Sequence, residues 1–159
     1  MRLYLVRHGQ ASSEEEDPQR GLSNEGAGEV RKVAGFIERL GLGVRAVWNS
    51  GKRRAEQTAE TLASALGGNV KTVARAGLAP NDLTREVMEE LASADEDLMI
   101  VGHLPFLDKL AWGLLAGGEG AEVFSFRSGG ILCLDRGEQS TWQVGWMVVP
   151  EILCEVRDG

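Results

Sequence analysis

The sequence is poor in the residues that build metal sites, disulfide frameworks and membrane segments. Its two cysteines, Cys133 and Cys154, show neither CxxC nor CxxH spacing, so they indicate free thiols of a cytoplasmic protein. No apolar stretch approaches the roughly 20 residues that span a bilayer. The first apolar run stops at Arg7, which leaves it too short for the core of a signal peptide. We therefore expect a cytoplasmic protein that makes no membrane contact.

The chain also lacks an excess of basic residues. It has 17 lysines and arginines against 24 acidic residues, which gives a formal net charge of -7 at pH 7. A surface that follows nucleic-acid phosphates needs surplus positive charge, so this balance argues against nucleic acid as a partner. A small anionic ligand remains compatible if a few arginines converge. With 43% hydrophobic residues and no internal repeat or linker, the sequence predicts a single domain over residues 1–159.

Apolar strand patterns alternate with helical patterns along the chain. Strands are expected at residues 3–6, 45–50, 69–74, 97–103, 129–135 and 141–149, and helices at 23–40, 55–66, around 87–91 and at 105–116. Such alternation predicts an α/β fold, a three-layer sandwich in which helices cover both faces of a mostly parallel sheet. The last two strands follow each other without a helix, which predicts one antiparallel strand at or near an edge of the sheet.

Unusual side chains follow three of the predicted strands. Arg7 and His8 end the first strand, His103 ends the strand "LMIVGH", and Arg53 and Arg54 open the helix after "AVWNS". In an open parallel sheet, ligands bind outside the carboxyl ends of the strands, where helix N-termini also favour anions. We therefore expect these groups to meet at one edge, provided that the strand order keeps the three ends adjacent. Of the two arginines, Arg53 is expected to be a solvated surface charge.

These residue types favour phosphoryl transfer through a histidine. Neutral imidazole is a nucleophile near pH 7, and arginines beside His8 disfavour its protonated form. Guanidinium groups also bind the phosphoryl oxygens on which charge sits during transfer, so no metal or other cofactor is expected. No carboxylate or cysteine lies at ligand spacing from either histidine. The sequence has neither a GxSxG elbow nor a P-loop.

Four segments carry a resemblance to the histidine phosphatase superfamily, also called the phosphoglycerate mutase-like fold. "VRHGQA" resembles its Arg-His-Gly signature, and "NSGKRRAEQTAE" resembles its second block, with Arg54 at the matching arginine. "VGHLP" resembles the third block, with His103 as the second histidine, and "QRGLSNEG" matches a further pattern that contains Arg20. The segments run in the family's order from residue 2 to about 106. The short chain is most similar to SixA-type phosphohistidine phosphatases.

The resemblance implies a two-step mechanism. His8 attacks phosphorus and becomes phosphohistidine, and water then hydrolyses this intermediate. The residues implied to bind the phosphoryl group or substrate are Arg7, Arg54, His103, Arg20 at the rim, and Gly9, whose missing side chain allows close approach of the ligand. With only about a dozen loop residues between the first strand and the first helix, the site is expected to be open and shallow.

One carboxylate is a candidate general acid. Many members of the family carry an acid that protonates the leaving group, and Asp82 lies where the third helix is expected to start. Aspartate is also a good N-cap residue at such a position, so both readings stay open. The acidic run Glu14 to Asp17 is expected to be a solvated loop.

Three functions fit these observations. The leading hypothesis is a metal-independent phosphatase that acts on phosphohistidine in proteins. The second is a phosphatase of a small phosphomonoester metabolite, and the third is a non-catalytic module that binds phosphoryl groups. The intact motif positions count against the third. The residues name neither the phosphorylated partner, nor the oligomeric state, nor the pathway.

Overall fold

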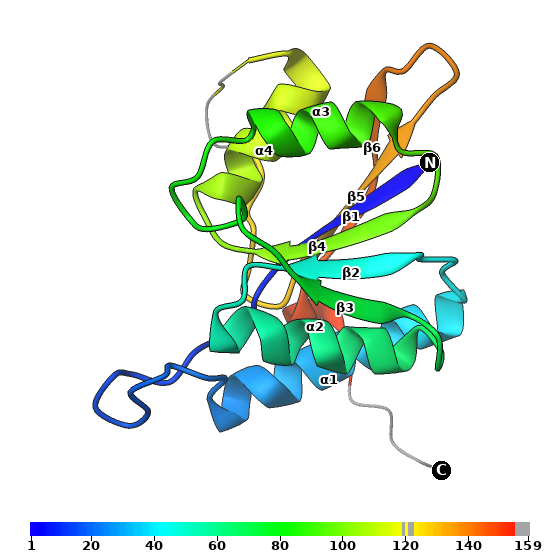
Figure 1. Cartoon of the computed structure of the whole chain (residues 1–159). Coiled ribbons are helices and arrows are strands. Elements are labelled where there is room, and N and C mark those ends of the chain that lie inside the picture. The colour runs from blue at the N-terminus through cyan, green and yellow to red at the C-terminus, as the bar shows by residue number, and fades with distance from the viewer. Residues whose placement is uncertain (119, 121–122, 155–159) are drawn as a thin grey trace.

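The computed structural model describes residues 1–118, 120 and 123–154. Six strands and four α-helices alternate over most of this length (Figure 1). The strands are β1 Arg2–Arg7, β2 Ala46–Asn49, β3 Lys71–Ala74, β4 Leu98–Gly102, β5 Ile131–Arg136 and β6 Trp142–Val148. The helices are α1 Asn24–Leu40, α2 Arg53–Ala65, α3 Arg85–Ser93 and α4 Phe106–Ala116, followed near the end of the chain by the 3₁₀ turn η1, Pro150–Ile152.

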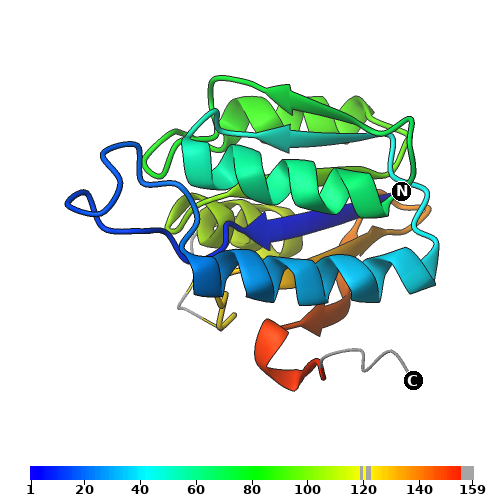
Figure 2. The same cartoon turned by 90° about the horizontal axis from the view of Figure 1, so that it is seen from below.

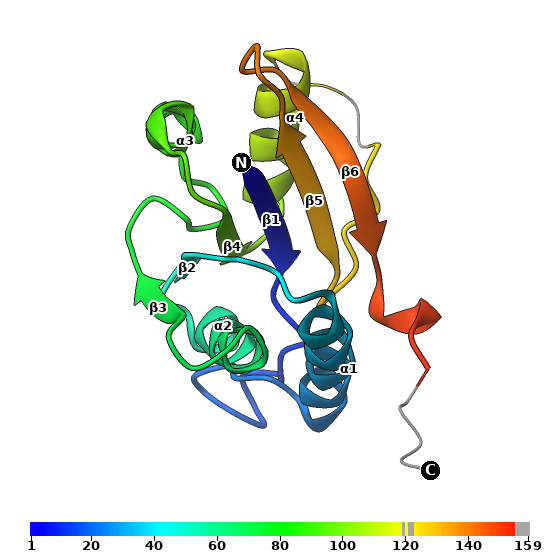
Figure 3. The same ribbon diagram turned by 90° about the vertical axis from the view of Figure 1, so that its right-hand side faces the viewer.

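The strands form one sheet in the order β3-β2-β4-β1-β5-β6. The pairs β2–β3, β2–β4 and β1–β4 are parallel, whereas β5 is antiparallel to both of its neighbours. Helices α1 and α2 cover one face of the sheet, and α3 and α4 cover the other (Figure 3). The predicted three-layer α/β architecture is therefore confirmed, and the one antiparallel strand lies next to the sheet edge.

Strict alternation along the central strands builds two separate cores. In β1, Tyr4 and Val6 pack with the α1 and α2 helices, while Leu3 and Leu5 pack with α3 and α4. The same division holds in β4 and β5, since successive side chains of a strand point to opposite faces. All four of these β1 side chains are fully buried. A strand with both faces covered reads as a continuous apolar run, which explains the "LYLV" pattern in the sequence.

Three helix starts show how well local signals predict boundaries. Ser23 caps α1 as expected, because its side chain accepts the backbone N–H of Gly26. Helix α2 begins at Arg53 with Lys52 at the N-cap position, so Ser50 lies outside the helix. Helix α3 begins at Arg85 with Thr84 as its N-cap. The reading of Asp82 as a helix cap is therefore wrong.

The strand order shows that the three strand ends with unusual side chains lie at one edge of the sheet. Strands β2, β4 and β1 are consecutive in the sheet, so their carboxyl ends lie side by side. The segment between β1 and α1 projects outward from this same edge (Figure 2). Within the described residues, no helix is long and apolar enough to cross a membrane.

Candidate active site

His8 is held by the backbone at the junction of β1 and β4. Its backbone N–H donates to the carbonyl of Gly102 at 3.0 Å, which continues the parallel ladder by one residue. The ring Nδ1 lies 2.7 Å from the carbonyl oxygen of Gly9. Because a carbonyl can only accept, Nδ1 carries a proton. In the neutral ring, Nε2 then holds the free lone pair that a nucleophile needs.

Gly9 is fixed by two different kinds of contact. Its backbone N–H donates to Oγ1 of Thr58 at 3.0 Å, and this buried hydroxyl donates to the carbonyl of Arg54 at 2.8 Å. A Cβ atom at position 9 would lie 2.7 Å from a methyl group of Val30 and 2.9 Å from one of Leu22. Close packing against these two side chains therefore requires glycine here. The proposed contact between Gly9 and a ligand stays a prediction.

His103 lies beside His8 and is almost completely buried. Its side chain is 2% exposed, and the two ring centroids are 4.8 Å apart with their planes at 54°. Nε2 lies 2.6 Å from Oγ of Ser50, whereas Nδ1 is buried without a hydrogen-bond partner. The two histidines, 95 residues apart in the chain, thus lie side by side in one site.

Arginines surround the two rings. Nη1 of Arg7 donates to the carbonyl of Phe126 at 2.8 Å, which fixes this guanidinium against the segment that leads into β5. The half-buried Arg54 has no carboxylate partner among the described residues. Burial and the nearby positive charge of Arg20 lower the pKa of Arg54. The guanidinium groups of Arg54 and Arg20 repel each other, and an anion bound between them would relieve this repulsion.

Both rings are neutral near pH 7. Burial, followed by the charges of Arg54, Arg7 and Arg20, lowers the pKa of His8 to about 4, against the opposing effect of the Gly9 carbonyl. Burial also lowers the pKa of His103 to about 3, with further contributions from His8, Arg54 and Lys52. Every side chain that acts on these two pKa values is a cation or an imidazole. The protein is acidic as a whole, yet this site is locally positive.

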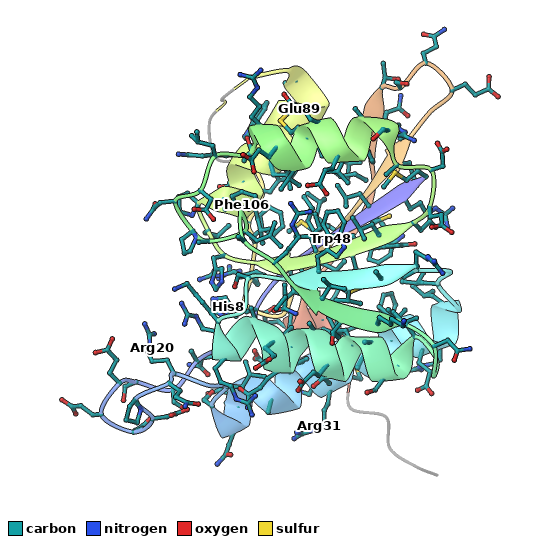
Figure 4. All side chains as sticks on the ribbon, viewed as in Figure 1. His8, Arg20, Arg31, Trp48, Glu89 and Phe106 are labelled. Atoms are coloured by element: carbon teal, nitrogen blue, oxygen red, sulfur yellow. The ribbon has the colours of Figure 1, made fainter. Side chains whose placement is uncertain are left out.

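Arg20 lies on the projecting loop (Figure 4), and its charge acts on His8 and Arg54. Its φ of 48° lies in the left-handed region, and its Nε donates to the carbonyl of Ser12 at 3.3 Å. Asp17 maintains this conformation, because its carboxylate accepts the backbone N–H groups of Gln19 and Gly21. The last residue of the acidic run thus organises the loop that carries Arg20.

Asp82 has a defined structural role. Its Oδ2 accepts the backbone N–H of Ala79 at 2.8 Å, and its own N–H donates back to the carbonyl of Ala79. It also lines a cavity of about 230 Å³ together with Thr84 and Lys109. Neither histidine lines this cavity. No contact in the structure joins Asp82 to the two rings.

The sequence analysis missed three groups that hold the site together. They are the hydroxyls of Ser50 and Thr58 and the carbonyl of Phe126. Ser50 follows the end of β2, and Thr58 lies one helical turn after Arg54 in α2. Both belong to the segment "NSGKRRAEQTAE", whose polar residues were the available signal. The carbonyl of Phe126 had none, since any residue carries one. Arg53 is exposed and pairs with Glu56 at 3.0 Å, as expected for a surface charge.

The described part of the chain contains no cluster of candidate metal ligands. No group of three or more His, Cys, Asp or Glu side chains there is arranged to hold an ion.

Comparisons with known proteins agree with the geometry. Residues 3–85 match the family model described as the histidine phosphatase superfamily (branch 1). An uncharacterized protein of Picosynechococcus sp. (strain ATCC 27264 / PCC 7002 / PR-6) is 34% identical over 144 residues, which cover 86% of each chain.

Solved structures share the whole fold. A structure of the protein histidine phosphatase SixA complexed with tungstate superposes with a TM-score of 0.82 at 23% identity, over 94% of this chain and 97% of the other. A putative phosphohistidine phosphatase SixA from Agrobacterium tumefaciens gives a TM-score of 0.76 at 21% identity, again over 94% and 97%. At these identities the likeness concerns the fold.

Proposed function

The chain belongs to the histidine phosphatase superfamily, and on this premise we propose that it is a metal-independent phosphatase of phosphohistidine in proteins. The observation that carries the proposal is the electrostatic character of the site. A neutral imidazole with a free Nε2 lies among cations, and the side chains that act on its pKa include no carboxylate. Such a site binds a phosphoryl dianion and attacks it, but it offers the leaving group no acid.

In the first step, the Nε2 lone pair of His8 forms a bond to phosphorus. The substrate ring is protonated by solvent on its other nitrogen. The bond between phosphorus and the substrate nitrogen breaks, its electron pair stays on that nitrogen, and the ring leaves as a neutral imidazole. His8 is then phosphorylated on Nε2 and protonated on Nδ1, so its ring carries a positive charge. The carbonyl of Gly9, 2.7 Å from Nδ1, stabilises this charge.

In the second step, a water oxygen attacks phosphorus on the side opposite to His8. The bond between phosphorus and Nε2 breaks, its electron pair returns to the ring, and inorganic phosphate leaves. In both steps Arg7, Arg54 and His103 bind the equatorial oxygens, and Arg20 closes the rim. Catalysis of this kind rests on positioned positive charge rather than on proton transfer.

The leaving group favours phosphohistidine over an alkyl phosphate. An alkoxide is a poor leaving group unless an acid protonates it. The conjugate acid of imidazole has a pKa of about 6.5, so a phosphorylated ring can take up a proton from solvent near neutral pH and depart as neutral imidazole. Asp82 is the one candidate acid from the sequence, and its carboxylate closes a turn with Ala79. The similarity in fold to SixA structures supports the same choice.

The experiment that tests this proposal compares two substrate types. We expect kcat/KM to be much higher for a phosphohistidine protein than for small alkyl phosphates, with activity unaffected by a strong chelator. Asp82→Asn should change phosphohistidine hydrolysis less than about twofold, because the departing imidazole needs no positioned acid. Glu86→Gln, on the exposed face of α3, is the matched control.

Two outcomes would overturn the assignment. If an alkyl phosphate is the better substrate and Asp82→Asn removes that activity by orders of magnitude, the protein is a small-molecule phosphatase. If neither substrate type nor an aryl phosphate turns over, the protein binds phosphoryl groups without hydrolysing them.

A further inference from the structure

One side chain of helix α2, that of Gln57, accepts a hydrogen bond from the loop over residues 11–22. Its Oε1 accepts the backbone N–H of Leu22 at 2.7 Å, across 35 residues of sequence. Because only the oxygen of the amide can accept an N–H, this contact also fixes the orientation of the amide. In the described part of the chain, every other side chain that accepts an N–H of this loop belongs to the loop itself. Gln57 therefore holds the base of the loop to the helix.

The backbone at Gly21 lies directly against this amide. A Cβ atom at position 21 would lie 2.9 Å from Oε1 of Gln57 and 3.0 Å from Oδ2 of Asp17. Oδ2 of Asp17 also accepts the N–H of Gly21 at 2.8 Å. The loop thus passes between two side-chain oxygens, and a larger residue would push one of them away. The residue that follows Arg20 is held from both sides.

The contact joins two short segments that each carry a guanidinium group. Gln57 lies three residues after Arg54 in α2, and Leu22 lies two residues after Arg20. Burial and then the positive charge of Arg20 lower the pKa of Arg54, so the two cations are close enough to repel each other. This repulsion favours movement of the exposed loop away from the helix. A neutral amide opposes the movement without pairing with either cation, whereas a carboxylate at position 57 would compete with an anionic ligand.

We propose that Gln57 is a positioning residue that holds the base of the loop to α2, and so keeps Arg20 close to Arg54 before an anion binds. Gln57 acts on Arg20 through the backbone of Leu22. Two cations that are already in place bind an anion more tightly than cations that must be ordered on binding, because the entropic cost of ordering is met during folding. The effect on substrate binding rests on the proposed phosphatase function, whereas the effect on a phosphate analogue does not.

Amide hydrogen exchange observes this contact directly. We expect the N–H of Leu22 to be protected in the wild type. Gln57→Met removes the acceptor and keeps the length of the side chain, so this amide should exchange about tenfold faster. Gln57→Glu keeps an oxygen at the same position and should retain the protection. Thr61→Val is the matched control one helical turn further along α2, since the hydroxyl of Thr61 donates to the carbonyl of Gln57 within the helix.

Tungstate binding and kinetics provide the functional readout. Gln57→Met should weaken tungstate binding and raise KM for the phosphohistidine protein, each by about three- to tenfold, with kcat changed by less than about twofold. Arg20→Gln should have a similar effect. The double variant should be no worse than Arg20→Gln alone, because both substitutions act through one guanidinium group. Thr61→Val should match the wild type in both measurements.

The two proposals fail in different ways. The role of Gln57 would be wrong, even in a fully active phosphatase, if Leu22 were unprotected in the wild type or if Gln57→Met left tungstate affinity and KM unchanged. An effect of Gln57→Met that adds to that of Arg20→Gln, or that lowers kcat as much as it raises KM, would also contradict this role. If the wild type hydrolysed no phosphorylated substrate but bound tungstate, and Gln57→Met weakened that binding as expected, the proposed reaction would be wrong and the role of Gln57 would stand.

Discussion

The two sides of the site are built in different ways. The inner wall consists of the ends of β1 and β4 and the first turn of α2. The backbone of His8 continues the ladder of the sheet, His103 is almost fully buried, and Arg54 lies in that turn of α2. The outer side is the loop over residues 11–22, which a single bridge between Ala11 and Leu22 closes at its base. The wall is held by long-range sheet pairing, whereas the loop is held largely by hydrogen bonds within itself.

This difference indicates that the wall and the loop have different functions. Groups that must meet the reacting atoms within a fraction of an ångström lie on the wall, because rigid elements preorganise a site best. Arg20, on the loop, is exposed, and its positive charge lowers the pKa values of His8 and Arg54. We expect the wall to set the rate of the chemical steps and the loop to set substrate capture. Substitutions of graded effect test this division.

The largest effect is expected at the nucleophile. His8→Ala should abolish turnover, because it removes the Nε2 lone pair that attacks phosphorus in the proposed reaction. Quenching the wild type without acid after addition of a radiolabelled phosphohistidine protein should trap label on the chain, and the variant should carry none. A labelled His8→Ala protein would show that another residue accepts the phosphoryl group.

The second effect concerns the half-buried cation of the wall. Arg54→Gln should reduce kcat by about 10²–10³-fold, as the loss of a preorganised donor does in other enzymes. Arg53→Gln provides the comparison one residue away, since Arg53 is paired with Glu56 at the surface and should lose less than twofold. Equal losses in both variants would mean that long-range charge, and not position on the wall, governs the rate.

A smaller effect is expected in the loop. Asp17→Ala removes the carboxylate that accepts the N–H groups of Gln19 and Gly21, so Arg20 should lose its fixed conformation. We expect KM to rise about three- to tenfold with kcat nearly unchanged, matching the effect of Arg20→Gln. The double variant should be no worse than either single one, because both act through one group. Glu15→Ala is the control. A fall in kcat would place the loop in the chemistry.

The same contrast explains which features could be predicted from the sequence. The wall residues lie at strand ends or in the helical turn that follows one, and alternation of strands and helices together with short motifs was enough to bring His8, His103 and Arg54 to one edge. Ser50 was missed because a serine after a strand resembles a helix cap, and only the three-dimensional distance to His103 reveals its contact. The interpretation of Asp82 as a helix cap was wrong because the turn that it closes depends on the backbone of Ala79 rather than on the helix that follows.

The smallest effect concerns stability and pH. The pKa of His8 is about 4 and that of His103 about 3 in the folded protein, against about 6.5 when unfolded. Well above pH 6.5 both histidines are neutral in the folded and the unfolded chain, so the free energy of unfolding does not depend on their protonation there. As the pH falls below 6.5, the two histidines bind protons in the unfolded chain but stay neutral in the folded chain, so the free energy of unfolding decreases. At pH 5.5 each histidine should lower it by about 1 kcal/mol.

Urea unfolding at pH 7.5 and 5.5 measures this loss. His8→Asn removes one of the two histidines that bind a proton only in the unfolded chain. Its free energy of unfolding should therefore fall by about 1 kcal/mol less than that of the wild type over this interval. Arg20→Gln should lose nearly as much as the wild type, because burial is the largest cause of the lowered pKa of His8 and the charge of Arg20 is the smallest. If His8→Asn showed the same pH dependence as the wild type, His8 would titrate normally in the folded protein. The inner wall would then be as open to water as the loop, and the contrast between them would not explain why the nucleophile stays neutral.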